Sequence, residues 1–82
     1  MKIKEIKNIL EDAKECGCLA TITLVNGQVS HVNFSKNIKK FTATDDVIID
    51  ERGNLVIILG KDGDRDYIDS DSIIRIFCKE GL

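Results

Sequence analysis

CLATITLVNGQVSHVNF, residues 18–34, is the stretch that decides the fold class. Its first eight residues are mostly aliphatic and β-branched, a composition that favours a strand. The pair Asn26-Gly27 follows between two apolar runs, which is the strongest short-range signal of a β-hairpin. Because a two-residue type I′ turn holds both central residues at positive φ, we expect Asn26 and Gly27 to form that turn. The stretch therefore predicts two antiparallel strands.

The returning strand, residues 28–34, departs from strict alternation. Val29 and Val32 are an odd number of residues apart, so a regular strand places them on opposite faces. One extra residue in the strand would bring both side chains to the same face. We therefore expect a bulge or a strong bend near residues 30–31.

Upstream of the hairpin, residues 1–16 show the period of an amphipathic helix. One stripe of the helix is apolar and consists of Ile3, Ile6, Ile9, Leu10 and Ala13. Mostly charged residues fill the positions between, and Gly17 follows as a C-terminal cap. Because so short a helix is marginal in isolation, we expect its stripe to dock on the strands.

Downstream of the hairpin, apolar runs alternate with turn signals. The runs are residues 47–49, 55–59, 67–68 and 73–78, separated by the loop 50–54, by Asp62-Gly63 and by the sequence DSDS at 69–72. The DSDS segment suits a single 3₁₀ turn, because short polar side chains bond nearby backbone amides. We expect one domain over residues 1–82, mainly β, with a helix over 1–16 and a small five- to six-stranded antiparallel barrel over 18–78.

This order of elements resembles the Sm-like small barrel of the Sm, LSm and bacterial Hfq proteins. The similar segments are residues 22–27, which resemble the first hairpin of that family, and residues 55–59 and 67–76, which resemble its last strands. The resemblance implies an oligomer that binds single-stranded RNA or DNA. The positions at which the family holds nucleotides are occupied here by Val32, Ile38 and Phe41, so none of those residues carries over. SH3-like barrels, which also have a 3₁₀ turn before the last strand, are an equal structural comparison and bind many kinds of partner.

Composition and charge narrow the class of protein. The net charge is −2 and the sequence pI is near 5.3, whereas a dedicated duplex-DNA binder carries excess positive charge. Residues 1–40 hold seven lysines against four acids, and residues 41–82 hold five basic residues against ten acids. No apolar stretch reaches the length of a membrane span, and the charged N-terminus does not suit a signal peptide. Three cysteines, an odd number, suit free thiols, so we expect a cytoplasmic protein with no membrane partner.

The cysteines and the lone histidine raise the question of a metal site. Cys16, Cys18 and Cys78 with His31 would supply four ligands, but the second closely spaced pair that structural zinc sites show is missing. We expect the three thiols to be buried in or beside the core, and His31 to lie on a strand face.

The acidic residues raise the possibility of a calcium loop or of acid–base catalysis. The run of alternating Asp from residue 62 has Gly in its second position rather than its sixth, and a strand on each side rather than a helix, unlike an EF-hand. A solvated hairpin turn fits it better. No carboxylate pair is placed in a cleft by the sequence. We expect no enzymatic activity and no cofactor.

One segment is the best candidate for ligand binding. Lys36, Asn37, Lys39, Lys40 and Phe41 together could grip a single strand by backbone charge and base stacking. We expect a non-enzymatic interaction module that binds a protein partner or itself through an edge strand or the helix face. The alternative is an Sm-like oligomer that binds single-stranded RNA or DNA.

Overall fold

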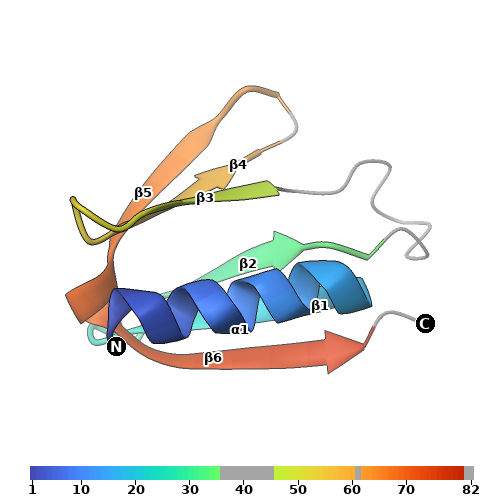
Figure 1. Cartoon of the computed structure of the whole chain (residues 1–82), viewed down its shortest axis with the longest axis horizontal. Coiled ribbons are helices and arrows are strands. Elements are labelled where there is room, and N and C mark those ends of the chain that lie inside the picture. The colour runs from blue at the N-terminus through green and yellow to red at the C-terminus, as the bar shows by residue number, and fades with distance from the viewer. Residues whose placement is uncertain (36–45, 61, 81–82) are drawn as a thin grey trace.

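Two three-stranded antiparallel sheets and one helix make up the described part of the chain (Figure 1). The computed structural model describes residues 1–35, 46–60 and 62–80. The elements are α1 (Ile3–Cys16), β1 (Cys18–Leu24), β2 (Val29–Asn33), β3 (Asp46–Asp50), β4 (Leu55–Leu59), β5 (Arg65–Asp69), the 3₁₀ turn η1 (Ser70–Ser72) and β6 (Ile73–Glu80). Sheet A has the order β2-β1-β6, and sheet B has the order β3-β4-β5. The expected mainly-β fold with one N-terminal helix is confirmed.

Helix α1 forms where the apolar stripe predicts it and covers the inner face of sheet A. Ile6, Leu10 and Ala13 are buried against the strands, as the stripe requires. Gly17 ends the helix in the left-handed conformation at φ 68°, and its N–H donates to Lys14 O at 3.2 Å. Within the described residues, no helix has the length and apolar character that a membrane crossing needs.

The hairpin of β1 and β2 is confirmed, but its turn is not type I′. Gly27 has φ 86°, whereas Asn26 is not among the residues with positive φ. Leu24 N–H donates to Gln28 O at 2.8 Å, and Gly27 N–H donates to Leu24 O at 2.9 Å. The loop therefore has three residues, with glycine in the left-handed position that such loops require.

The bulge expected near residues 30–31 is absent, and β2 pairs with β1 in unbroken register. Val32 is buried and Val29 is 53% exposed, so the two valines do lie on opposite faces. The irregularity is instead between β1 and β6, where Thr23 pairs with Arg75 and Leu24 pairs with Ile73. Ile74 is thus the extra residue on β6 and is 57% exposed.

Sheet B follows the turn signals of the sequence. Asn54 closes the β3–β4 loop at φ 53°, and Gly63 lies in the β4–β5 turn at φ 83°. The 3₁₀ turn is confirmed as η1, and the Asp69 side chain accepts a hydrogen bond from Asp71 N–H at 3.0 Å. Short polar side chains stabilise the turn by the expected mechanism.

The two sheets and the helix share one core, but no ladder joins the sheets within the described residues. The barrel closure expected from the sequence is therefore not seen there, because β2 ends at Asn33 in one sheet and β3 begins at Asp46 in the other. Helix α1 contacts β1 and β6 of sheet A and β3 of sheet B. The buried apolar residues are Ile6, Leu10, Ala13, Cys18, Ala20, Ile22, Val32, Phe34, Val56, Ile58, Ile68 and Ile73.

Candidate functional site

The segment predicted to bind nucleic acid, Lys36, Asn37, Lys39, Lys40 and Phe41, lies outside the described residues. The nucleic-acid site therefore remains a prediction from the sequence. The candidate surfaces that the structure describes are the cysteine cluster, the outer faces of the two sheets, and a hollow beside the N-terminus.

The three cysteines gather where α1 ends, β1 begins and β6 finishes. They line a shallow depression of about 230 Å³ together with Ile9, Asp12 and Ala13. Cys18 is buried, but Cys16 and Cys78 are exposed, so the expected burial holds for one thiol of three. Loss of hydration around the sulfur is the main cause that raises the pKa of the Cys18 thiol, and of the Cys78 thiol although that residue is exposed, above the ordinary cysteine value. Both are therefore less reactive than an ordinary thiol at neutral pH, because the thiolate is the nucleophile.

No metal centre forms among the described residues. Nowhere in 1–35, 46–60 or 62–80 do three or more His, Cys, Asp or Glu side chains converge to hold an ion. His31 is exposed on a strand face, as expected, and its Nδ1 lies 3.1 Å from Thr21 Oγ1. In the predicted solvated turn, Asp62 and Asp64 are both exposed.

A hollow of about 340 Å³ lies beside the N-terminus and is lined by residues 1–4, Asn54, Ser70 and Asp71. The Met1 amino group donates to Ser70 O at 3.1 Å and to Ile73 O at 2.8 Å. These bonds hold the start of the chain against the junction of η1 and β6.

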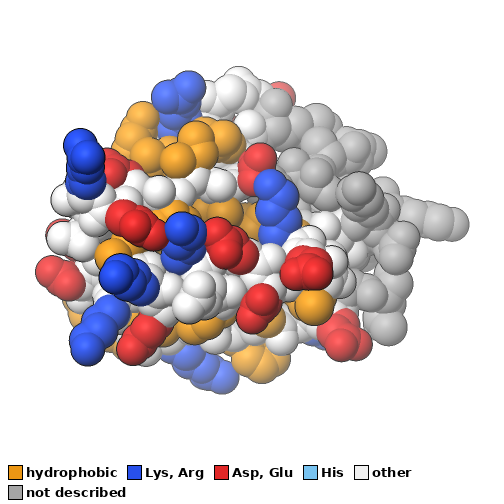
Figure 2. All heavy atoms as spheres, in the orientation of Figure 1, with side chains coloured by type: hydrophobic (Ala, Val, Ile, Leu, Met, Phe, Trp, Pro, Cys, Tyr) orange, Lys and Arg blue, Asp and Glu red, His pale blue; other side chains and the backbone are white. Residues whose placement is uncertain are grey.

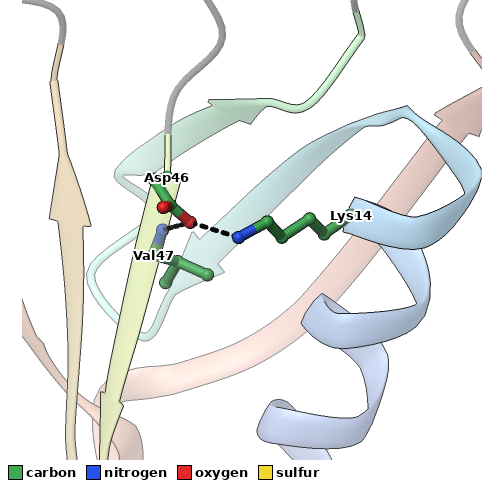
Figure 3. A network of polar contacts seen from close by, with 3 residues as sticks. All are labelled: Lys14, Asp46 and Val47. Atoms are coloured by element: carbon green, nitrogen blue, oxygen red, sulfur yellow. Dashed lines mark hydrogen bonds and ion pairs between the residues drawn. The ribbon is translucent and has the colours of Figure 1, made fainter.

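The solvent face of α1 is polar, and two ion pairs join it to β3 and the β3–β4 loop. Figure 2 shows Lys or Arg side chains interspersed with Asp or Glu over this part of the surface. Lys14 Nζ lies 2.9 Å from Asp46 Oδ1, which also accepts a hydrogen bond from Val47 N–H at 2.8 Å (Figure 3). The hydrogen bond from Lys14 is the main cause that lowers the pKa of Asp46. Lys7 pairs with Glu51 at 3.0 Å, and this hydrogen bond raises the pKa of Lys7.

The outer face of sheet B is apolar along its central strand. Leu55, Ile57 and Leu59 of β4 are half-buried and alternate with the buried Val56 and Ile58. The register places Ile57 beside Ile48 on β3 and beside Tyr67 on β5. Ile48 is 49% exposed and Tyr67 is 56% exposed, and Figure 2 shows hydrophobic side chains on the surface over β4 and β5. The row Ile48–Ile57–Tyr67, with Leu55 and Leu59 beside it, is called the apolar row below.

The outer face of sheet A differs in chemistry. Its positions are Val29 and His31 on β2, Leu19, Thr21 and Thr23 on β1, and Arg75, Phe77 and Lys79 on β6. Phe77 is 50% exposed, and the Arg75 guanidinium lies over its ring at 5.5 Å from the centroid. The centre of this face is threonine rather than aliphatic, and its β6 edge is basic and aromatic.

Comparisons with known proteins found no family model, no curated protein and no solved structure that matches this chain.

The sequence did contain a signal for the apolar row. In the segment LVIIL at residues 55–59, every position is apolar, so both faces of the strand are apolar. This is the pattern of a strand that is covered on both faces. Val56 and Ile58 are covered by the core, whereas no described residue covers Ile57 fully. The strand itself is predictable from the sequence, and its uncovered second face follows only once the core is known.

Proposed function

We propose that this chain is a non-enzymatic protein-interaction module whose binding surface is the apolar row of sheet B. Its partner is a protein surface with an apolar centre and a basic rim. The observation that carries the proposal is that β4 is apolar on both faces and that only one face is covered by the described core. Contiguous exposed apolar side chains rimmed by polar residues are typical of interaction sites.

The composition of the apolar row fits the centre of an interface. Tyr67 offers an exposed aromatic side chain, a residue type enriched among those that dominate binding energy. Carboxylates flank the row at Asp50 and Asp69, on either side of Leu55. Asp46, which is paired with Lys14, and Arg65 flank Leu59 at the other end, so the Leu55 end is the acidic part of the rim and favours basic residues on a partner.

The helix face is the weaker of the two docking surfaces expected from the sequence. Its apolar stripe is already used, because Ile6, Leu10 and Ala13 are buried in the core. The edge of β6 is the better docking surface of the two. This eight-residue strand pairs with β1 on one side, and its other edge has no partner strand within the described residues. Exposed Ile74 and Phe77 lie on that strand.

The finer fold proposal is a small barrel of the Sm-like or SH3-like type in an open form. The order of helix, short strands and a 3₁₀ turn before the last strand supports it. The fold alone is compatible with many partners and does not carry the function.

A photo-crosslinking experiment tests the proposed function. A photoreactive phenylalanine analogue replaces Tyr67 in the full chain, and a matched chain carries it at Val25, which is 64% exposed in the β1–β2 turn. Both are irradiated in an extract of the native cells, and adducts are identified by mass spectrometry. We expect a discrete protein adduct at position 67 that Ile57→Thr abolishes, and none at position 25. The absence of any specific adduct at position 67 would rule out the proposed surface.

Single-strand nucleic-acid binding through residues 36–41 remains the alternative. Titration with labelled oligo(U) and oligo(A) at low salt tests it, with Lys36→Glu, Lys39→Glu and Lys40→Glu combined as the variant. Micromolar binding that the triple variant loses would favour this alternative, because phosphate contacts dominate such affinities.

A further inference from the structure

Charge is divided unequally between the two sheets. Residues 46–60 and 62–72, which contain sheet B, carry eight carboxylates and two arginines. The three strands of sheet A carry Arg75, Lys79 and Glu80 as their charged residues, with His31 besides. Glu80 pairs with the buried Cys18 and so lies on the inner-face side of the sheet. The outer face of sheet A therefore presents basic side chains with no carboxylate among the described residues.

The outer faces of the two sheets are complementary in charge. On β6 the outer positions are Arg75, Phe77 and Lys79, basic on both sides of an apolar residue. On sheet B the cross-strand row of Asp50, Leu55 and Asp69 is acidic on both sides of an apolar residue. At the other end of this face Asp46 is paired with Lys14 and Arg65 lies beside Leu59, so the acidic end is the Leu55 end.

We propose that the partner of the apolar row is a second copy of this chain, whose outer sheet A face, led by Arg75, Phe77 and Lys79, packs on the outer sheet B face. This inference rests on the proposed function and names its partner. Phe77 and Val29 supply apolar contacts toward Ile57 and Tyr67, and the basic residues approach Asp50 and Asp69. Sheets that pack face to face in this way bury both apolar centres at a spacing of about 10 Å.

Charge favours this pairing over the symmetric ones. Packing sheet B on sheet B would bring the acidic residues of two copies together. Packing sheet A on sheet A would place arginine and lysine side chains against each other. Like charges across an interface are unfavourable. A nucleic-acid strand on sheet A is also less favoured. Two cationic side chains neutralise few phosphates, and the acidic half of the same chain repels the rest of the strand.

A head-to-tail contact of this kind does not close on itself in a dimer. Each copy that docks its sheet A face keeps a free sheet B face, so association continues into rings or chains. The mean mass should therefore rise past that of a dimer with increasing concentration. Salt should weaken the association, because exposed charge pairs are screened.

Sedimentation velocity of the full chain tests the inference, from micromolar to millimolar protein at about 0.05 M and about 0.5 M salt. Two variants each remove one half of the charge match: Arg75→Gln/Lys79→Gln, and Asp50→Asn/Asp69→Asn. Asparagine keeps the side-chain oxygen that accepts from Gly53 N–H and from Asp71 N–H, so both turns are retained. The control Glu11→Gln/Glu15→Gln makes the same charge change as Asp50→Asn/Asp69→Asn, on the exposed face of α1.

We expect each charge variant to weaken association about threefold to tenfold, and the four substitutions together to weaken it by less than the product of the two effects. That shortfall is the signature of direct pairing between the two faces. Ile57→Thr should weaken association about tenfold, while the matched Val25→Thr and the helix control should leave it unchanged. Far-ultraviolet circular dichroism and thermal melts of every variant establish that the fold is retained.

Four outcomes would overturn the inference. They are a monomer at all concentrations, a mass that stops at two copies, effects of the two charge pairs that simply multiply, and tight oligonucleotide binding that Arg75→Gln/Lys79→Gln abolishes in place of self-association. A monomer that still gives a discrete adduct with another protein at position 67 would refute self-pairing and leave the proposed function standing. A chain that self-associates but gives no adduct at position 67 would refute the proposed surface and the inference together.

Discussion

Sheets A and B each have three antiparallel strands but differ in the residues on their two faces. In sheet A the central strand β1 alternates, with Ala20 and Ile22 buried and Thr21 and Thr23 on the outer face. In sheet B the central strand β4 is apolar at every position, 55–59. A sheet that is covered on one face alternates, and a strand covered on both faces is apolar throughout.

The difference teaches that two sheets can share one core and still leave different apolar side chains on their outer faces. Helix α1 places Ile6, Leu10 and Ala13 in the core under sheet A. The outer face of that sheet has threonine at its centre and exposed Val29 and Phe77 on its edge strands. Sheet B packs Val56 and Ile58 on that same core and leaves Ile57 half-buried. The apolar area left on the outer face of sheet B is therefore continuous along its central strand, whereas that of sheet A lies on its edge strands.

The sharpest way to break this comparison uses two adjacent residues of β4. Ile58→Ala removes a core side chain that is 7% exposed and should lower the free energy of unfolding by about 2–5 kcal/mol, since it leaves a cavity. Ile57→Ala removes a half-buried side chain from the outer face and should cost about 1 kcal/mol or less. Urea unfolding at low micromolar concentration measures both, below the range in which self-association would contribute.

Two results would contradict this assignment of faces. Equal losses for the two variants would mean that the outer face of sheet B is as closed as the core. A larger loss for Ile57→Ala would mean that β4 is in the opposite register. Val56→Ala, at a fully buried position, is the matched control and should follow Ile58→Ala.

The hairpin turns of the two sheets give an intermediate effect. Gly27 in sheet A has φ 86°, and a Cβ there would meet no heavy atom within 4 Å, so Gly27→Ala costs backbone strain alone, about 1–2 kcal/mol. In sheet B the corresponding strained residue is Asn54 at φ 53°, a type that tolerates this conformation. Asn54→Gly should therefore change the free energy of unfolding by less than about 0.5 kcal/mol. Thermal unfolding compares the two.

A graded substitution separates strain from lost contacts in this experiment. Gly27→Asn should cost less than Gly27→Ala, because asparagine enters the left-handed region more readily. If both substitutions at Gly27 were neutral, the three-residue loop that Gly27 closes would not be the conformation that limits stability.

Local chemistry explains which parts of the fold could be predicted from the sequence. The apolar stripe of Ile6, Leu10 and Ala13 follows the period of a helix, and α1 forms there. The short polar side chains of residues 69–72 favour a turn, and η1 forms there. The turn type was wrong because the register pairs Leu24 with Gln28, which makes Val25 part of the loop.

Strand pairing explains what could not be predicted. A bulge was expected on β2 because Val29 and Val32 were both assumed to face the core. Only Val32 does, and Val29 lies exposed on the outer face of sheet A. The true bulge follows from the pairing of β6 with β1, a contact between residues some fifty positions apart, and only Ile73-Ile74 marks it in the sequence. For the same reason the apolar row joins Ile48 to Tyr67 across three strands, and no local pattern contains both.

The smallest effect concerns the ion pair that fastens α1, the cover of sheet A, to the edge of sheet B. The hydrogen bond from Lys14 lowers the pKa of Asp46 below its unfolded value, so the pair stabilises the folded chain above about pH 4 and the stabilisation is lost as pH falls through the lowered pKa. Both side chains are more than half exposed, at 58% and 52%, so solvent screening limits the pair to about 0.2–1 kcal/mol.

Asp46→Asn keeps an acceptor for Val47 N–H and should lower the free energy of unfolding by that amount at pH 7. At pH 2, as protonation of Asp46 removes its charge, the difference from the native chain should shrink toward zero. Urea unfolding at both pH values, with Glu15→Gln as the helix control, measures it. A difference of the same size at both pH values would show that the charge of Asp46 is not the source of the stabilisation.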